Sequence, residues 1–501
     1  MKKISEWLAI FLIFDIERNT KEQQLAITVD RNLWIGSLMH LNVNPANVQV
    51  VIVTVSQKKH GASNEIKNTI YEKNPFQPGD SSRPKLKKLT NHNLKHQAIL
   101  LETEATKNLF KYIDSLYEVN HRMVVTLGHG GVFGMNYVDD YFTKSIKNAI
   151  ELKGVDPKKE LTEIIDEYDF MTSSNMKQKK MLKDFKGIND QPLYSKLFKN
   201  YKIKDELSTR EFAESFTGFT DIDGKKPVDI LVIGNCFMQN IFAQYDLYKM
   251  VDYYVAPISG ISYPGYNFID ILKRLENKTY NSVKEVAEAF ADKTKLLNHR
   301  VYLNRGKHAS FAKTAMDERW FVQCIKLDNE VYNKFGELFS LFTQDLASIG
   351  ANNTSFLTLV KEAYEMCYSY SNKTMPTLMF IDFFVFCEAL RQCILNKIHL
   401  LKPTNFDQIL SVISQILQLK TQFAISSYVG KDFYSEIKKE IDFGCGVDSI
   451  GFGFLFLKDV SSKSSIPKIL DPSYTNQKQP VLNSGTRYLE FLQSMVDVFK
   501  F

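Results

Sequence analysis

A cysteine and a histidine each stand where an apolar run of the sequence ends. Cys236 follows the run Val228 to Ile233, and an amphipathic helix pattern begins directly after it. His129 follows the run Met123 to Leu127 and lies within the glycine-rich sequence GHGG at 128–131. If both runs are parallel strands of one sheet, the thiol and the imidazole lie at the same edge of that sheet.

Peptide hydrolysis by a cysteine requires a thiolate nucleophile, a proton donor for the leaving amine and N–H donors for the oxyanion. Cys236 and His129 would supply the first two, and the backbone N–H groups of Cys236 and Gly130 the third. A helix N-terminus after the cysteine would lower the pKa of its thiol toward the reactive thiolate. Glycines beside both residues let the backbone approach a substrate closely. The combination predicts a cysteine hydrolase.

Each residue by itself has a simpler interpretation. A cysteine that ends a core strand is commonly a small buried hydrophobic residue, and a histidine beside glycines is commonly a turn residue. A dinucleotide-binding loop would need glycine at Phe133, and no phosphate-binding GxxxxGK[ST] loop is present. His92 and His96 have helical spacing but no neighbouring carboxylate, which favours a solvated helix face over a metal site.

The surrounding pattern predicts the elements that would position Cys236 and His129. Short apolar runs rich in β-branched and aromatic residues predict buried strands, at Trp7–Phe14, Val48–Val55, Met123–Leu127, Val228–Ile233 and Tyr253–Ala256. Helical spacing predicts helices at Thr106–Tyr117 and Ser208–Phe216, and Ser208 and Glu211 can form a capping box. This alternation predicts an α/β fold, with a mostly parallel sheet between helical layers.

The length of 501 residues predicts more than one domain. Residues 1–300 carry the alternating pattern and include a Lys-rich segment, 148–206, that we interpret as an insertion. Residues 301–501 form a mainly helical C-terminal region with a late strand at 449–457. The expected helices of this region are Asp328–Ser348, Ser355–Tyr370, Thr377–Asn396, Asn405–Lys420 and Arg487–Phe499.

Composition narrows the class of protein. Hydrophobic residues make up 44% and charged residues 24%, which is typical of a globular chain. The net charge of +6 does not indicate nucleic-acid binding, and the six cysteines have no metal-site spacing and suit a reducing compartment. The apolar run from Trp7 to Phe14 is too short to span a membrane and is followed by charges rather than a cleavage site. We therefore expect no membrane span, and a cytoplasmic rather than a secreted protein.

Several motifs together resemble the clostripain family of cysteine peptidases, which belongs to the caspase-like clan. The similar segments are Trp7–Asp15, Thr126–Gly131, Leu207–Ala213, Asp229–Met238, Tyr253–Leu272 and Ser449–Leu457. The resemblance implies a caspase-like αβα domain in which Cys236 is the nucleophile and His129 the general acid–base, acting on a protein or peptide substrate. Further oxyanion or substrate-binding positions would be Gly130, Gly234, Asn235 and Ser259.

The resemblance also bears on cofactors and maturation. No cofactor is expected, except that some family members respond to calcium; the sequence has no acidic loop of calcium-binding spacing. Relatives are often cut internally, and the segment 148–206 would be the place here. The sequence predicts no particular oligomeric state.

Two positions depart from the family pattern. The family has an Asp two residues before the nucleophile, where this chain has Gly234, and the loop from Ala256 to Gly260 carries no acids. A buried Arg or Lys guest would lack a partner, so we expect a small, neutral or apolar residue on the amino side of the cleaved bond, the P1 residue. The same change leaves open a second hypothesis, a catalytically inactive caspase-like module that binds a protein partner.

Overall fold

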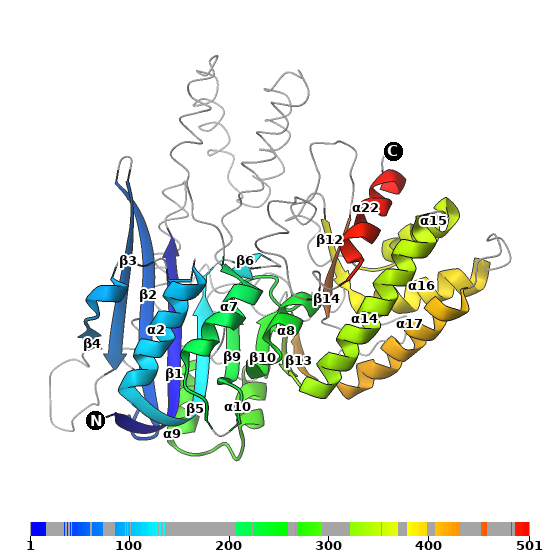
Figure 1. The fold of residues 1–501 in the computed structure, drawn as a ribbon. Helices are drawn as coiled ribbons and strands as arrows, with labels where there is room; N and C mark the ends of the chain where they lie inside the picture. Colours follow the sequence, from blue (N-terminus) through cyan, green and yellow to red (C-terminus); the bar gives the residue numbers. More distant parts are fainter. Residues whose placement is uncertain are drawn as a thin grey trace.

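A nine-stranded mixed sheet lies at the centre of the described part of this computed structural model (Figure 1). Its strand order is β13-β11-β10-β9-β5-β1-β2-β3-β4. The strands are β1 (Lys3–Ile16), β2 (Val48–His60), β3 (Ser63–Lys73), β4 (Leu86–Leu89), β5 (Tyr117–Leu127), β9 (Val228–Gly234), β10 (Val251–Pro257), β11 (Phe321–Lys326) and β13 (Ile425–Val429).

The structure describes residues 2–16, 35, 38, 41, 43–60, 63–73, 86–95, 97, 99–100, 102–128, 130–131, 134–135, 207–222, 224–258, 266, 268–292, 321–351, 353–368, 378–397, 406–423, 425–430, 452–457, 482 and 486–499. The predicted insertion at 148–206 and His96 lie outside these residues.

The central strands β10, β9, β5, β1 and β2 run parallel, and the outer strands pair antiparallel. These central strands are apolar because helices cover both of their faces. Along β1, for example, Leu8 and Ile10 pack into the core on one face, and Ala9 and Phe11 pack into the core on the other.

Two helical layers cover the sheet (Figure 1). One core cluster joins the sheet to α2 (Thr103–Leu116), α7 (Thr209–Ser215) and α8 (Ile241–Leu247). The opposite cluster joins it to α9 (Phe268–Glu276) and α10 (Val283–Ala289). Short 3-10 helices lie at η1 (His92–Leu94), η2 (Phe216–Gly218) and η4 (Lys420–Gln422).

The C-terminal region is mainly helical and packs beside the sheet, next to α8 (Figure 1). Its helices are α14 (Asn329–Gly350), α15 (Thr354–Glu365), α16 (Phe383–Lys397), α17 (Asp407–Leu419) and α22 (Tyr488–Phe499). A two-stranded sheet of β12 (Leu378–Asp382) and β14 (Gly453–Leu457) lies among them. The same region contributes β11 and β13 to the main sheet, so both halves of the chain build that sheet.

The predicted fold class is confirmed: a mostly parallel sheet lies between helices, with a largely helical C-terminal region. Each predicted strand overlaps an observed one, and the run from Trp7 to Phe14 lies in the central strand β1. The predicted helix Thr377–Asn396 is wrong in its first residues, which form β12. The reason is Asp382, whose carboxylate accepts from the backbone N–H groups of Phe384 and Val385 and so starts the helix there. Among the described helices, none is long and apolar enough to cross a membrane.

A buried ion pair fixes β5 against α2. Arg122 Nη2 lies 2.7 Å from Asp114 Oδ1, and the two side chains are only 4% and 5% exposed. The other carboxylate oxygen of Asp114 accepts from the Thr220 hydroxyl at 2.6 Å, and the backbone N–H of Arg122 donates to Asp229 at 2.7 Å. The pair therefore joins α2, β5 and the segment that leads into β9.

Replacing Asp114 by Ala is expected to lower the free energy of unfolding by about 3–5 kcal/mol, because the Arg122 guanidinium stays buried without its carboxylate. Guanidinium unfolding measures this loss. The double variant Asp114→Ala/Arg122→Met removes the unpaired charge, so its free energy of unfolding should fall clearly less than that of Asp114→Ala. If the free energy of unfolding of Asp114→Ala lies within about 1 kcal/mol of the wild-type value, the ion pair contributes no more than an exposed pair does, which would contradict its buried, structural role.

Candidate active site

The segments that carry the histidine and the cysteine leave the sheet from neighbouring strands. β5 and β9 pair in parallel, and Leu127 at the end of β5 is the register partner of Gly234 at the end of β9. His129 follows Leu127 by two residues, and Cys236 follows Gly234 by two residues. His129 and Ser259 themselves lie outside the described residues.

Gly130 lies directly against the backbone of Cys236. A Cβ atom at Gly130 would lie 2.4 Å from the carbonyl oxygen of Cys236 and 2.9 Å from its amide nitrogen. No side chain fits this space without moving the backbone, so glycine is required here. The two sequence motifs therefore meet main chain to main chain, immediately after the proposed catalytic histidine.

The histidine motif is anchored by a small three-stranded sheet made of β6 (Gly130–Gly131), β7 (Gly134–Met135) and β8 (Leu207–Ser208). β8 leads into α7, whose first turn is held by the predicted capping box. Ser208 N donates to Glu211 Oε2 at 2.8 Å, and Glu211 N donates to Ser208 Oγ at 3.2 Å. A capped helix thus holds the segment that pairs with the His motif.

The end of β9 is closely packed against β5. A Cβ atom at Gly234 would lie 2.7 Å from both the Thr126 carbonyl oxygen and Leu127 Cδ2, so this position also requires glycine. The Asn235 side chain is fully buried, and its Oδ1 accepts from Thr126 Oγ1 at 2.7 Å. In this arrangement Asn235 ties the two strands together, and its side chain does not face the solvent.

Cys236 is partly exposed, whereas Cys324, Cys367, Cys387 and Cys393 are buried. Burial raises the pKa of the Cys324 and Cys387 thiols, which favours their protonated forms. Among the described cysteines, Cys236 therefore combines access with a position at the carboxyl edge of the parallel strands.

The helix after Cys236 does not begin at once, contrary to the sequence prediction. α8 begins at Ile241, with Asn240 as its N-cap. The intervening chain forms an elbow, in which Phe237 has a φ of 59°. A left-handed residue cannot continue an α-helix, so Cys236 does not occupy the first helical turn.

Tyr266 supports the end of β9. It is fully buried, and its hydroxyl donates to the Ile233 carbonyl oxygen at 2.9 Å. Burial raises the pKa of Tyr266 well above its ordinary value, and the neighbouring Tyr254 and Cys236 raise it further. The phenol therefore stays a neutral hydrogen-bond donor under all ordinary conditions.

Sequence reasoning missed the residues that support Cys236. The Thr126 hydroxyl donates to Asn235, and the Tyr254 hydroxyl donates to the Met238 carbonyl oxygen two residues after Cys236. Both residues lie within predicted strands, and nothing in the strand pattern marks their hydroxyls as donors. Asn240 did carry a signal, because Asn before an apolar helical run is a typical N-cap. In the described part of the chain, no group of three His, Cys, Asp or Glu side chains is placed to hold a metal ion.

No protein-family model matches the chain, and no curated protein matches it. Among solved structures, it is similar to iotapain, a secreted C11 cysteine protease of Bacteroides thetaiotaomicron, with a TM-score of 0.44 and 10% identity over 84% of this chain and 85% of that chain. An inactive zymogen C11 protease of Parabacteroides distasonis gives a TM-score of 0.43 and 11% identity over 85% of each chain. A clostripain of Bacteroides thetaiotaomicron bound to a peptide inhibitor gives 0.28 and 9%, over 57% of this chain and 97% of that chain.

Replacing Gly130 by Ala should displace the Cys236 backbone, because the added methyl group collides with main-chain atoms. We expect the alkylation of Cys236 by iodoacetamide to slow by about tenfold, because thiol reactivity depends on the surroundings that stabilise the thiolate and on access, and both depend on this backbone. Peptide mapping by mass spectrometry reads out the modified cysteine.

Gly224→Ala is the matched control. Gly224 has a φ of 74°, so alanine is strained there, but no atom lies within 4 Å of the added Cβ. It precedes β9 and so lies at the opposite end of that strand from Cys236. An equal change of thiol reactivity in both variants would show that lost stability, not the local collision, is responsible.

Proposed function

We propose that this protein is a cysteine endopeptidase, with Cys236 as nucleophile and His129 as general acid–base. The observation that supports this most is the register of β5 and β9, in which Leu127 lies opposite Gly234. His129 follows Leu127 by two residues, and Cys236 follows Gly234 by two residues. Gly130 lies against the backbone of Cys236. A dyad requires two such side chains to face one groove.

In the proposed reaction the Cys236 thiolate attacks the carbonyl carbon of the peptide bond. Backbone N–H groups of Gly130 and Cys236 stabilise the oxyanion. The tetrahedral intermediate collapses, the C–N bond breaks, and the His129 imidazolium gives its proton to the leaving amine. Water, deprotonated by the same imidazole, then attacks the thioester and releases the acid and the thiol.

We further propose that the P1 residue is small, neutral or apolar. Gly234 stands where a carboxylate would be needed for a basic P1 residue, and the packing around it leaves no room for a side chain. A buried cation without a carboxylate partner is strongly unfavourable.

The reaction as written needs no metal ion, so peptidase activity should persist in excess EDTA.

Hydrolysis of a peptide library tests the assignment. Wild type should cleave without preference for Arg or Lys at P1. Cys236→Ala and His129→Ala should each lower kcat/KM by at least about 10³-fold, because the nucleophile and its acid–base partner act as one unit. Cys324→Ala, at a buried cysteine of β11, should retain the activity.

Thiol labelling separates this enzyme from an inactive binding module. At pH 7 an acyloxymethyl ketone should label Cys236 far faster than Cys324 or Cys387, whose raised pKa values leave little thiolate. Cys324 and Cys387 are also enclosed in the core, so their labelling should stay slow while the fold is intact. Equal labelling of all cysteines, together with no cleavage of any peptide, would favour the binding module.

A further inference from the structure

The chain leaves Cys236 through a backbone conformation that needs external support. Phe237, the next residue, has a φ of 59°, a backbone conformation that is unfavourable for a bulky residue such as phenylalanine. Such conformations persist only where surrounding groups hold them, and they concentrate at functional sites. The groups that hold this elbow therefore also set the direction of the Cys236 side chain.

One buried side chain closes the elbow from inside. Asn240 is fully buried, and its amide nitrogen donates to the carbonyl oxygens of Phe237 and Met238, each at 3.3 Å. Its Oδ1 accepts from the backbone N–H of Ala243 at 2.8 Å. The same amide therefore caps α8 and holds the two carbonyl groups that follow the cysteine.

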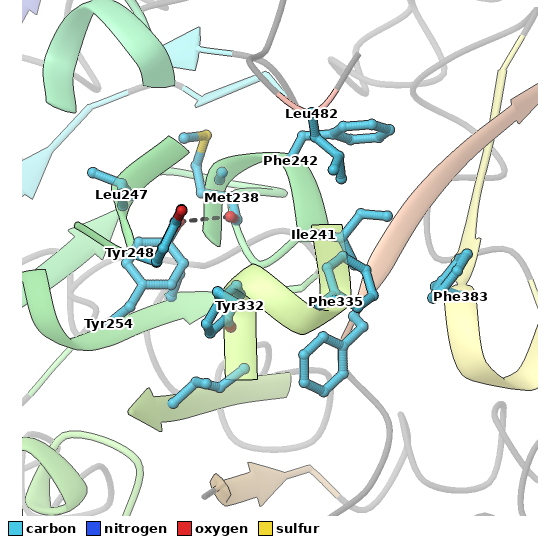
Figure 2. Packing of buried hydrophobic residues seen from close by; sticks show 14 of the residues in the cluster. Met238, Ile241, Phe242, Leu247, Tyr248, Tyr254, Tyr332, Phe335, Phe383 and Leu482 are labelled. Carbon is cyan, nitrogen blue, oxygen red and sulfur yellow. Dashed lines mark hydrogen bonds between the residues drawn. The ribbon is translucent and has the colours of Figure 1, made fainter. Parts of the chain in front are cut away.

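Strand β10 holds the elbow from a second side. The Tyr254 hydroxyl donates to the Met238 carbonyl oxygen at 2.6 Å (Figure 2). Gln239 N donates to the Pro257 carbonyl oxygen at 2.9 Å. Burial raises the pKa of Tyr254 well above its ordinary value, so this hydroxyl remains a donor. Met238 and Gln239 are thus held between the strand and Asn240.

The third support comes from the C-terminal region. Asn240 forms a parallel β-bridge with Gly453, the first residue of β14. The preceding residue, Phe452, donates its N–H to Asp382 Oδ2 at 3.0 Å. Asp382 is fully buried, and its Oδ1 caps α16. One carboxylate therefore fixes the chain that bridges to Asn240.

We propose that Asn240 is a positioning residue for Cys236, and that the C-terminal region supports it through Gly453 and Asp382. These groups determine the backbone from which the thiol projects. The helical C-terminal region is then part of the catalytic unit rather than a separate binding module. The effect on catalysis rests on the proposed peptidase function, whereas the effect on thiol reactivity does not.

The variant Asn240→Asp tests the proposal. Aspartate keeps the oxygen that caps α8 but loses the N–H donors to the two carbonyl groups. Asn353→Asp is the matched control, because Asn353 caps α15 in the same way, its side chain accepting from Phe356 N at 3.0 Å. Asp382→Asn, which removes one acceptor from the C-terminal support, provides a second and independent variant.

The readouts are the pH profile of Cys236 alkylation by iodoacetamide and the separate values of kcat and KM, with melting temperature as the check on folding. For Asn240→Asp we expect a shifted alkylation profile and a loss of about ten- to hundredfold in kcat with little change in KM. Asp382→Asn should change the alkylation profile and kcat in the same direction but to a smaller extent. Asn353→Asp should leave the alkylation profile and kcat unchanged.

A purely structural role for Asn240 would lower the melting temperature of Asn240→Asp while leaving the alkylation profile and kcat as in wild type; Asn353→Asp, which keeps its capping oxygen, should melt as wild type does. That result would overturn the proposal. If Cys236 alkylation shifts in Asn240→Asp but wild type cleaves no peptide, the positioning role holds and the peptidase assignment fails.

Discussion

The pairing of β5 with β9 is the constraint on which the site depends. Parallel strands end at the same edge of a sheet, and the register opposite Leu127 places Gly234 there. Gly130 and Gly234, near this edge, each lie where a Cβ atom would collide with the neighbouring segment. Close approach of the two backbones is therefore built into the sequence, and the proposed chemistry follows from what lies two residues beyond each strand.

The contacts around this edge are polar but buried, and each serves to fix the backbone. Thr126 binds Asn235, Tyr266 binds the Ile233 carbonyl group, and Asn240 binds the carbonyl groups after Cys236. Satisfied buried hydrogen bonds of this kind specify one conformation, because breaking any of them leaves an unpaired polar group away from water. A rigid rim of this kind suits a nucleophile that must meet both an imidazole and a peptide carbonyl.

The C-terminal region has two roles in this architecture. It adds β11 and β13 to the sheet, and its strand β14 bridges to Asn240. The sheet and the elbow are thus completed by residues that follow Cys236 by 85 positions or more in the sequence, since β11 begins at Phe321. In agreement with this dependence, the described residues of the C-terminal region share one hydrophobic core cluster with α8 and the sheet.

The buried strands could be predicted from local sequence patterns, whereas the strand register and the first residues of α8 and α16 could not. The buried strands were evident because helices on both faces require unbroken apolar runs, as in β1 and β9. The register was not, since the contact of Thr126 with Asn235 joins residues 109 positions apart. The start of α8 was misplaced because apolar periodicity continues through Phe237, while the elbow is imposed by Asn240 and β10. The strand β12 was missed for a similar reason, as Asp382 decides where the helix begins.

A crystal structure with a peptide-derived covalent inhibitor would give the distance between Cys236 Sγ and the nearest ring nitrogen of His129, and this distance decides whether the two side chains form a dyad. We predict that the inhibitor is bonded to Cys236 and that this distance is about 3–4 Å, within or slightly beyond hydrogen-bond reach. An imidazole that points away from the groove, or a Cys236 sulfur enclosed in apolar packing and unmodified, would contradict it.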